Sequence, residues 1–175
     1  MLPKRIKPKY KDAAARTLVE ATQRPVDRDR GERPAISREP VPLTIRKLTN
    51  RDGDFYTLIG PYLAHRTVHK ELGGPPWDDP GKRWYIAVDP AGELLGFGAV
   101  TVEKAAITFC SSWVRAEKRC GGVYAALLDA RIADYGKATV RARCTALSKA
   151  ALEARGFTVA REVGQYFEME RKPKP

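Results

Sequence analysis

The chain has 175 residues, of which 43% are hydrophobic and 30% are charged, and its formal net charge is +11. This length suits one domain with its own core and is too short for two comfortable ones. No stretch approaches the roughly 20 consecutive apolar residues that a membrane-spanning helix needs, and no apolar segment follows the charged start at 1–5. We therefore expect neither a membrane protein nor a secretory signal. The excess of Lys and Arg favours an anionic partner such as nucleic acid or a phosphorylated cofactor.

The three cysteines are Cys110, Cys120 and Cys144, an odd number without CxxC spacing. This pattern predicts reduced thiols, a cytoplasmic protein and no structural zinc site.

The first 42 residues differ from the rest of the chain. They contain six prolines, and eleven Lys or Arg against six Asp or Glu. Proline at this density interrupts helices and strands, and few large apolar side chains are present to be buried. Only 10–22, with its alanines, favours a short helix. We expect 1–42 to be a basic, disordered tail and 43–175 to be a single domain.

Within this domain, apolar residues alternate in several segments and recur at helical spacing in others. Gly60–Pro61 is predicted to separate the first two helices, and Gly156 to end the last one. The element order predicts an α/β (α+β) domain in which helices cover a mixed sheet. Strands are predicted at 43–48, 84–88, 94–102, 105–114, 139–144 and 158–170 (one strand or a bent pair), and helices at 55–59, 61–72, 123–135 and 148–155.

Two short sequence motifs lie within these predicted elements. Val114–Tyr124 follows a predicted strand and opens a predicted helix, with Arg119 and Gly122 at the spacing Arg-x-x-Gly. It resembles the pyrophosphate loop, Arg/Gln-x-x-Gly-x-Gly/Ala, of the GNAT superfamily of acyl-CoA-dependent N-acyltransferases. Ser148–Phe157 is similar to the late helix of that family, which ends in Gly-Phe. The resemblance implies a mostly antiparallel central sheet flanked by helices, acetyl-CoA or another acyl-CoA as donor, and an amine as acceptor.

The loop carries the chemistry that a pyrophosphate needs. A glycine-rich turn at the start of a helix directs several N–H groups into one concavity, and nearby arginines add positive charge. The alternative is a tight turn whose basic residues are merely solvated. The resemblance also implies that the preceding strand parts from its neighbour and that its free backbone holds the pantetheine arm. The predicted cofactor-binding residues are Trp113, Val114, Arg115, Arg119, Cys120, Gly121, Gly122, Val123 and Tyr124.

Three features depart from the family pattern. Tyr124 stands where the loop usually ends in a small residue, and Leu152 stands where a tyrosine often acts as general acid. No acidic residue lies in 108–114 to serve as the strand-borne base. These departures set the chain apart from an ordinary amine acetyltransferase.

Candidate catalytic residues come from several segments. His65 and His69 lie four residues apart on one predicted helix and could act as base; without a third ligand nearby they predict no metal site. Ser111 and Ser112 could bind substrate or form a transient acyl-enzyme. Tyr166, in the last strand, is the replacement candidate for the acid. The alternatives are exposed helix histidines and a core or rim tyrosine.

Three functions remain open on these grounds. The first is an acyl-CoA-dependent N-acyltransferase acting on the amine of a small molecule or protein. The second is a GNAT-like DNA-modifying enzyme resembling phage Mom-type proteins, and the third is a non-catalytic nucleic-acid-binding protein on the same scaffold. The basic tail and overall charge favour contact with DNA, whereas fold alone does not fix a substrate.

Overall fold

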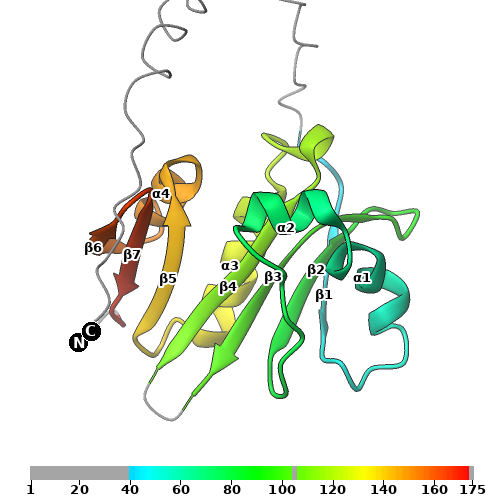
Figure 1. Cartoon of the computed structure of the whole chain (residues 1–175), viewed down its shortest axis with the longest axis horizontal. Helices are drawn as coiled ribbons and strands as arrows, with labels where there is room; N and C mark the ends of the chain where they lie inside the picture. Colours follow the sequence, from blue (N-terminus) through cyan, green and yellow to red (C-terminus); the bar gives the residue numbers. More distant parts are fainter. Residues whose placement is uncertain (1–39, 104–105, 174–175) are drawn as a thin grey trace, which may run out of the picture. The chain divides into compact units, whose positions relative to one another are not determined.

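The computed structural model describes residues 40–103 and 106–173. Seven strands form one sheet in the order β1-β2-β3-β4-β5-β7-β6 (Figure 1). All neighbouring strands are antiparallel except β4 and β5, which are parallel. The strands are β1 (Thr44–Leu48), β2 (Arg83–Val88), β3 (Leu94–Val102), β4 (Ile107–Val114), β5 (Val140–Thr145), β6 (Thr158–Val163) and β7 (Tyr166–Arg171).

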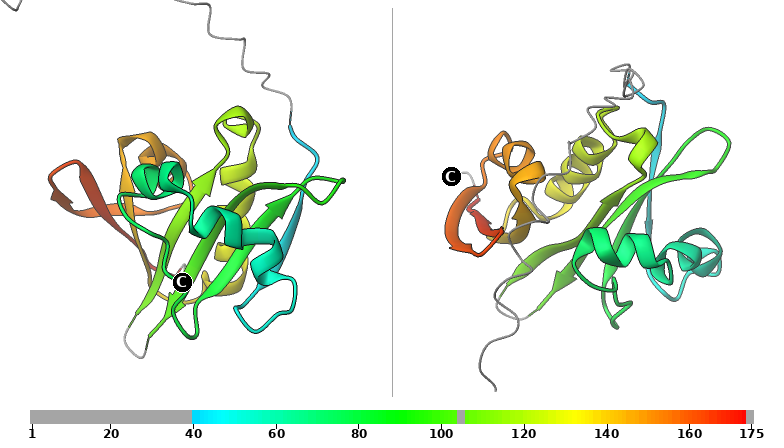
Figure 2. Two further views of the ribbon diagram at one scale, coloured as in Figure 1. Left: turned by 45° about the vertical axis from the view of Figure 1, so that its right-hand side comes forward. Right: turned by 45° about the horizontal axis from the view of Figure 1, so that its top comes forward.

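Helices cover both faces of this sheet. The pair α1 and α2 lies on one face and α3 on the other, as the turned views show (Figure 2). The last helix, α4, packs against β5 and β7. The helices are α1 (Phe55–Leu63), α2 (Arg66–Leu72), α3 (Val123–Tyr135) and α4 (Ala146–Glu153), with a 3₁₀ turn, η1 (Ala116–Lys118), between β4 and α3.

Strand β2 supplies side chains to two hydrophobic cores, one on each face of the sheet. Trp84 and Ile86 pack with α1 and α2, whereas Tyr85 and Ala87 pack with α3. This division follows from the alternation of side chains along a strand. Because β2 is buried on both faces, its sequence reads as a continuous apolar run and not as an alternating one.

The predicted break between the first two helices is in the wrong place. Helix α1 continues through Gly60 and Pro61, and the break falls at Ala64 and His65. His65 adopts the extended conformation of an N-cap (φ −82°, ψ 122°), and its Nδ1 accepts a hydrogen bond from the Thr67 N–H at 3.3 Å. Capping of α2 therefore sets the boundary, so His65 is the N-cap of the helix that contains His69, and the His69 N–H donates to the His65 carbonyl at 3.1 Å.

Other expectations match the structure closely. The strand at 94–102 and the helix at 123–135 have the predicted bounds. The segment 158–170 is the bent pair, β6 and β7, and Gly156 has the expected left-handed conformation (φ +82°). No helix of the described part of the chain has the length and apolarity that crossing a membrane requires.

Contacts with the domain begin slightly ahead of the predicted boundary at 43. The Val41 N–H donates to the Gly121 carbonyl at 3.2 Å, and the Val41 side chain packs against the core on the α3 side. Most of the predicted tail at 1–42, namely residues 1–39, lies outside the residues that the structure describes.

Candidate functional site

Strands β4 and β5 pair over only part of their length. Their parallel register runs from Ile107↔Val140 to Phe109↔Ala142, yet β4 continues to Val114 and β5 to Thr145. Beyond the paired segment the two strands diverge, which leaves an opening toward their carboxyl ends (Figure 1). One side of the second half of β4 therefore has backbone N–H and C=O groups without a strand partner.

The same half of β4 contains a bulge on its other side, toward β3. The register passes from Ala99↔Cys110 to Phe97↔Trp113, so two residues of β4 face the single Gly98. One of them, Ser111, has φ +48°, which non-glycine residues adopt rarely. Bulges of this kind change the direction of the backbone and are frequent beside active sites.

At its carboxyl end, β4 leads through η1 to the start of α3. Gly122 is the N-cap of α3 with φ +82°, and a Cβ added there would meet nothing within 4 Å. The first intrahelical bond runs from the Ala126 N–H to Gly122, so the N–H groups of 123–125 precede the helical ladder. Open space before such N–H groups suits an anion. Gly121 differs, because a Cβ on it would lie 2.7 Å from the Val41 side chain.

Acidic side chains already bind the two arginines of this loop. Arg119 Nη2 lies 2.7 Å from Glu71 Oε2, and its Nε donates to the Val114 carbonyl at 3.1 Å. Arg115 Nε donates to Glu117 Oε1 at 2.7 Å, a hydrogen bond that raises the pKa of Arg115. An incoming phosphate would have to compete with both carboxylates for these guanidinium groups.

Tyr124, the second residue of α3, packs against the core on the α3 side. Burial raises its pKa, and the adjacent Ser148 hydroxyl of α4 acts in the opposite direction. The bulky side chain at this loop position thus lies beside Ser148 of α4.

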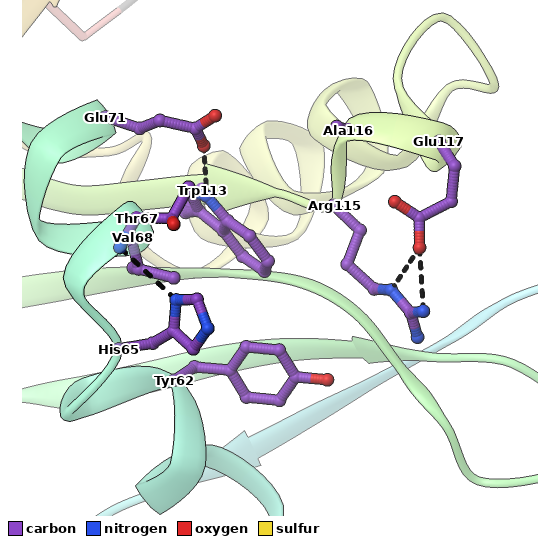
Figure 3. Close-up of a pocket in the computed structure, with 9 residues that line it drawn as sticks. All are labelled: Tyr62, His65, Thr67, Val68, Glu71, Trp113, Arg115, Ala116 and Glu117. Atoms are coloured by element: carbon purple, nitrogen blue, oxygen red, sulfur yellow. Dashed lines mark hydrogen bonds and ion pairs between the residues drawn. The ribbon is translucent and has the colours of Figure 1, made fainter.

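On the other face of β4, a cavity of about 360 Å³ lies between the α1–α2 pair and the loop that follows β4 (Figure 3). The Tyr62 and Trp113 rings face it with centroids 5.4 Å apart. Trp113 Nε1 donates to Glu71 Oε2 at 2.6 Å. Aromatic faces beside a carboxylate suit a cationic amine. The cavity is lined by Tyr62, His65, Thr67, Val68, Glu71, Trp113, Arg115, Ala116 and Glu117.

No family model matches the sequence, and no curated protein matches it. Solved structures share its fold. The ribosomal-protein-S18-alanine N-acetyltransferase from Escherichia coli superposes with a TM-score of 0.58 at 18% identity, over 76% of this chain and 95% of that one. An acyl-CoA N-acyltransferase from Pseudomonas aeruginosa gives 0.58 at 15% identity over 74% and 99%. An acetyltransferase of GNAT family from Staphylococcus aureus gives 0.50 at 10% over 75% and 100%.

This chain has the GNAT fold. Its mixed, mostly antiparallel sheet with flanking helices confirms the fold class expected from the sequence. The β4–β5 pairing ends at Phe109 and Ala142, in agreement with the parting of this strand that the resemblance implied.

The two histidine side chains, four residues apart at the start of α2, have different partners. His65 lines the cavity, and because its Nδ1 accepts from Thr67, the neutral ring carries its proton on Nε2. His69 Nε2 lies 2.5 Å from the Leu63 carbonyl oxygen at the junction of α1 and α2. Within the described ranges, no group of three His, Cys, Asp or Glu residues could hold a metal ion.

The other candidates lie around the opening. Tyr166, at the start of β7, places its hydroxyl against Gly73, where a Cβ would come within 2.6 Å of it. It thereby joins the β5–β7 part of the sheet to the end of α2. Ser111 forms the bulge of β4, and the Ser112 hydroxyl accepts from Arg131 Nη1 at 3.0 Å.

Three residues of this region were not among the site residues predicted from the sequence. Tyr62 and Glu71 carry no local signal, because only the packing of α1 and α2 on β4 brings them to Trp113 and Arg119. Arg131 did carry one: it lies four residues after Leu127 on the apolar face of α3, where a charged residue is unexpected.

Proposed function

We propose that the chain is an acyl-CoA-dependent N-acyltransferase that acts on an amine. The observation that carries this proposal is the continuity of the β4–β5 opening with the start of α3. A strand with free backbone groups leads through η1 to Gly122, the N-cap of α3, which has open space beside its Cα. Solved structures with this fold include N-acyltransferases that use acyl-CoA, by their names.

The donor would lie along β4, and the residues present fit its phosphate end. The N–H groups of 123–125 would bind the pyrophosphate, with Arg115 and Arg119 adding positive charge. Backbone groups of 110–114 would hold the arm that carries the thioester. Such a donor supplies an activated acyl group. The chain's part is to hold it in place and to keep the reacting carbonyl beside the second half of β4.

The acceptor amine would enter through the cavity on the α1–α2 side. Tyr62, Trp113 and the Glu71 carboxylate line this cavity and suit an ammonium group. An amine must lose a proton before it attacks, and His65, which lines the cavity, would accept that proton on Nδ1 after this atom releases the Thr67 N–H. Tyr166, on the far side of the opening, is the candidate that would protonate the leaving thiolate.

Thiol release from acetyl-CoA tests this assignment. We expect free CoA to appear when the protein is mixed with acetyl-CoA and a panel of primary amines that includes polyamines, amino acids and peptide amino termini. His65→Gln should reduce the rate of release, whereas His69→Gln, bonded outside the cavity, should change it far less at matched folded protein. A wild-type protein that shows no saturable binding of acetyl-CoA would overturn the proposal.

A further inference from the structure

Helix α3 contains an arginine that is buried without a counter-charge. Arg131 is 0% exposed. Its Nε donates to the Leu127 carbonyl at 2.9 Å and its Nη1 to Ser112 Oγ at 3.0 Å, while Nη2 has no hydrogen-bond partner among the residues that the structure describes. The guanidinium carbon lies 5.0 Å from the centre of the Phe109 ring. Burying a cation without a paired anion is costly.

The cation persists at neutral pH. Burial lowers the pKa of Arg131 to about 10, which still leaves the side chain protonated there. No acidic side chain in the described part of the chain forms an ion pair with it. An apolar side chain of similar size at this position would avoid the cost, so the charge requires an explanation other than stability.

The surroundings are built to admit this side chain. A Cβ on Gly98 would lie 2.8 Å from the guanidinium carbon and 2.9 Å from Nη1, so the absence of a side chain there makes room for the arginine. Gly98 is the β3 residue that faces the bulge of β4. Ser112 is one of the two bulge residues and the other, Ser111, has the unusual φ. The guanidinium therefore bonds to the part of β4 that has parted from β5.

We propose that Arg131 is a positioning residue for acyl transfer, acting through Ser112 on the bulge of β4. It holds the bulge in one conformation and places a permanent positive charge behind backbone groups that border the opening. This inference rests on the proposed function. Attack of an amine on a thioester forms the C–N bond and moves the carbonyl π electrons onto oxygen. The carbonyl then re-forms, the C–S bond breaks with its electron pair on sulfur, and the ammonium proton passes to a base. A fixed positive charge behind the part of β4 that would hold the thioester favours negative charge on that oxygen.

The test compares the affinities of acetyl-CoA and CoA, which differ only in the acyl group, by calorimetry. We expect Arg131→Met to weaken acetyl-CoA binding about fivefold relative to CoA, with an unchanged or raised melting temperature because a buried charge is removed. Arg131→Lys should restore part of the ratio of acetyl-CoA affinity to CoA affinity that the wild type shows. Arg171→Met is the matched control, because Arg171 donates to the backbone carbonyls of Gly136 and Arg155; it should leave the ratio unchanged.

Two further variants separate positioning from general damage. Ser112→Ala cuts one hydrogen bond and should lower the same ratio even if Arg131→Met does not fold. Gly98→Ala displaces the guanidinium while its charge is retained, and should speed hydrogen exchange of the amides at 110–114. Equal losses for both ligands, or an unchanged ratio, would overturn the inference while the proposed function stands. A wild-type protein that binds neither ligand would overturn both.

Discussion

The carboxylate of Glu71 binds the guanidinium of Arg119, with 2.7 Å between Oε2 and Nη2. The same oxygen accepts the Trp113 indole N–H. One atom of α2 thus connects a wall of the cavity to the loop that we assign to the donor phosphates. The two halves of the site are joined before any ligand enters.

Glu71→Gln should release Arg119 for the donor. Because a neutral amide competes less with phosphate for the guanidinium, CoA should bind about two- to fivefold more tightly at low salt, a modest gain because the pair is partly exposed. Glu117→Gln, which frees Arg115 in the same way, is the companion variant. Calorimetric titration with CoA measures both. Weaker binding by the Glu71 variant would mean that Glu71 positions Arg119 for the phosphates.

Asp134 should make the fold sensitive to acid. Its carboxylate accepts hydrogen bonds from Lys47 and, at 2.6 Å, from the Tyr85 hydroxyl, and these bonds lower its pKa below 3.8. The stabilisation is therefore fully present above pH 3.8 and is lost as the pH falls through the depressed value of the folded state. Asp134→Asn should reduce the free energy of unfolding by about 1 kcal/mol at pH 7.

Urea denaturation of the wild type and the Asp134 variant at pH 7 and pH 3 measures this effect. The difference between the two proteins should shrink at the lower pH, because the Asp134 carboxyl of the unfolded wild type takes up a proton below pH 3.8. Lys47→Met should produce a smaller change in the same direction, because it removes one of the two bonds that lower the pKa of Asp134 while its ion pair is exposed. An equal difference at both pH values would show that the charge of Asp134 does not matter.

Long periodic segments could be predicted from the sequence, and contacts between distant segments could not. The helix at 123–135 was found because its apolar residues recur over three turns. The break near Gly60 was misplaced, because the cap formed by His65 depends on a side-chain contact and not on a glycine or proline. His65 therefore caps the helix that contains His69 and does not lie inside it.

Only those parts of the candidate site that have a local sequence pattern could be predicted. Gly122 has a local signature, whereas the cavity depends on α2 packing against the end of β4. Trp113, expected beside the cofactor, lies in the cavity because alternation along β4 directs it toward α1 and α2. The roles expected of Ser111, Ser112 and Tyr166 stay predictions.

The basic segment ahead of the domain should be dispensable for folding. A form that begins at residue 40 keeps the Val41 contact with Gly121. Since the deleted part is rich in proline and charge, its removal should change the melting temperature by less than about 2 °C for a domain of this size. Scanning calorimetry of both forms measures the change. A large drop would show that residues 1–39 pack on the domain.

The same pair of proteins tests whether the basic residues ahead of the domain bind DNA. If DNA is a partner, the full chain should bind duplex DNA with a steep dependence on salt, and the shortened form with a shallower one. Acetyl-CoA binding should be equal in both forms. If the full chain shows no DNA binding at about 50 mM salt, the DNA hypothesis is wrong, because nonspecific binding is strongest at low salt.

Calorimetric titration of acetyl-CoA into wild type and Gly122→Val tests the central claim most directly. The added side chain would occupy the open space beside Gly122 at the start of α3 and strain a residue at φ +82°. Gly92→Val is the matched control, since Gly92 has φ +86° with open space around it in the turn after β2. Arg119→Gln keeps a residue that the loop pattern permits. The account predicts saturable binding by wild type, clear binding by Arg119→Gln and Gly92→Val, and loss of binding in Gly122→Val. Wild-type affinity in the Gly122 variant would contradict the donor site.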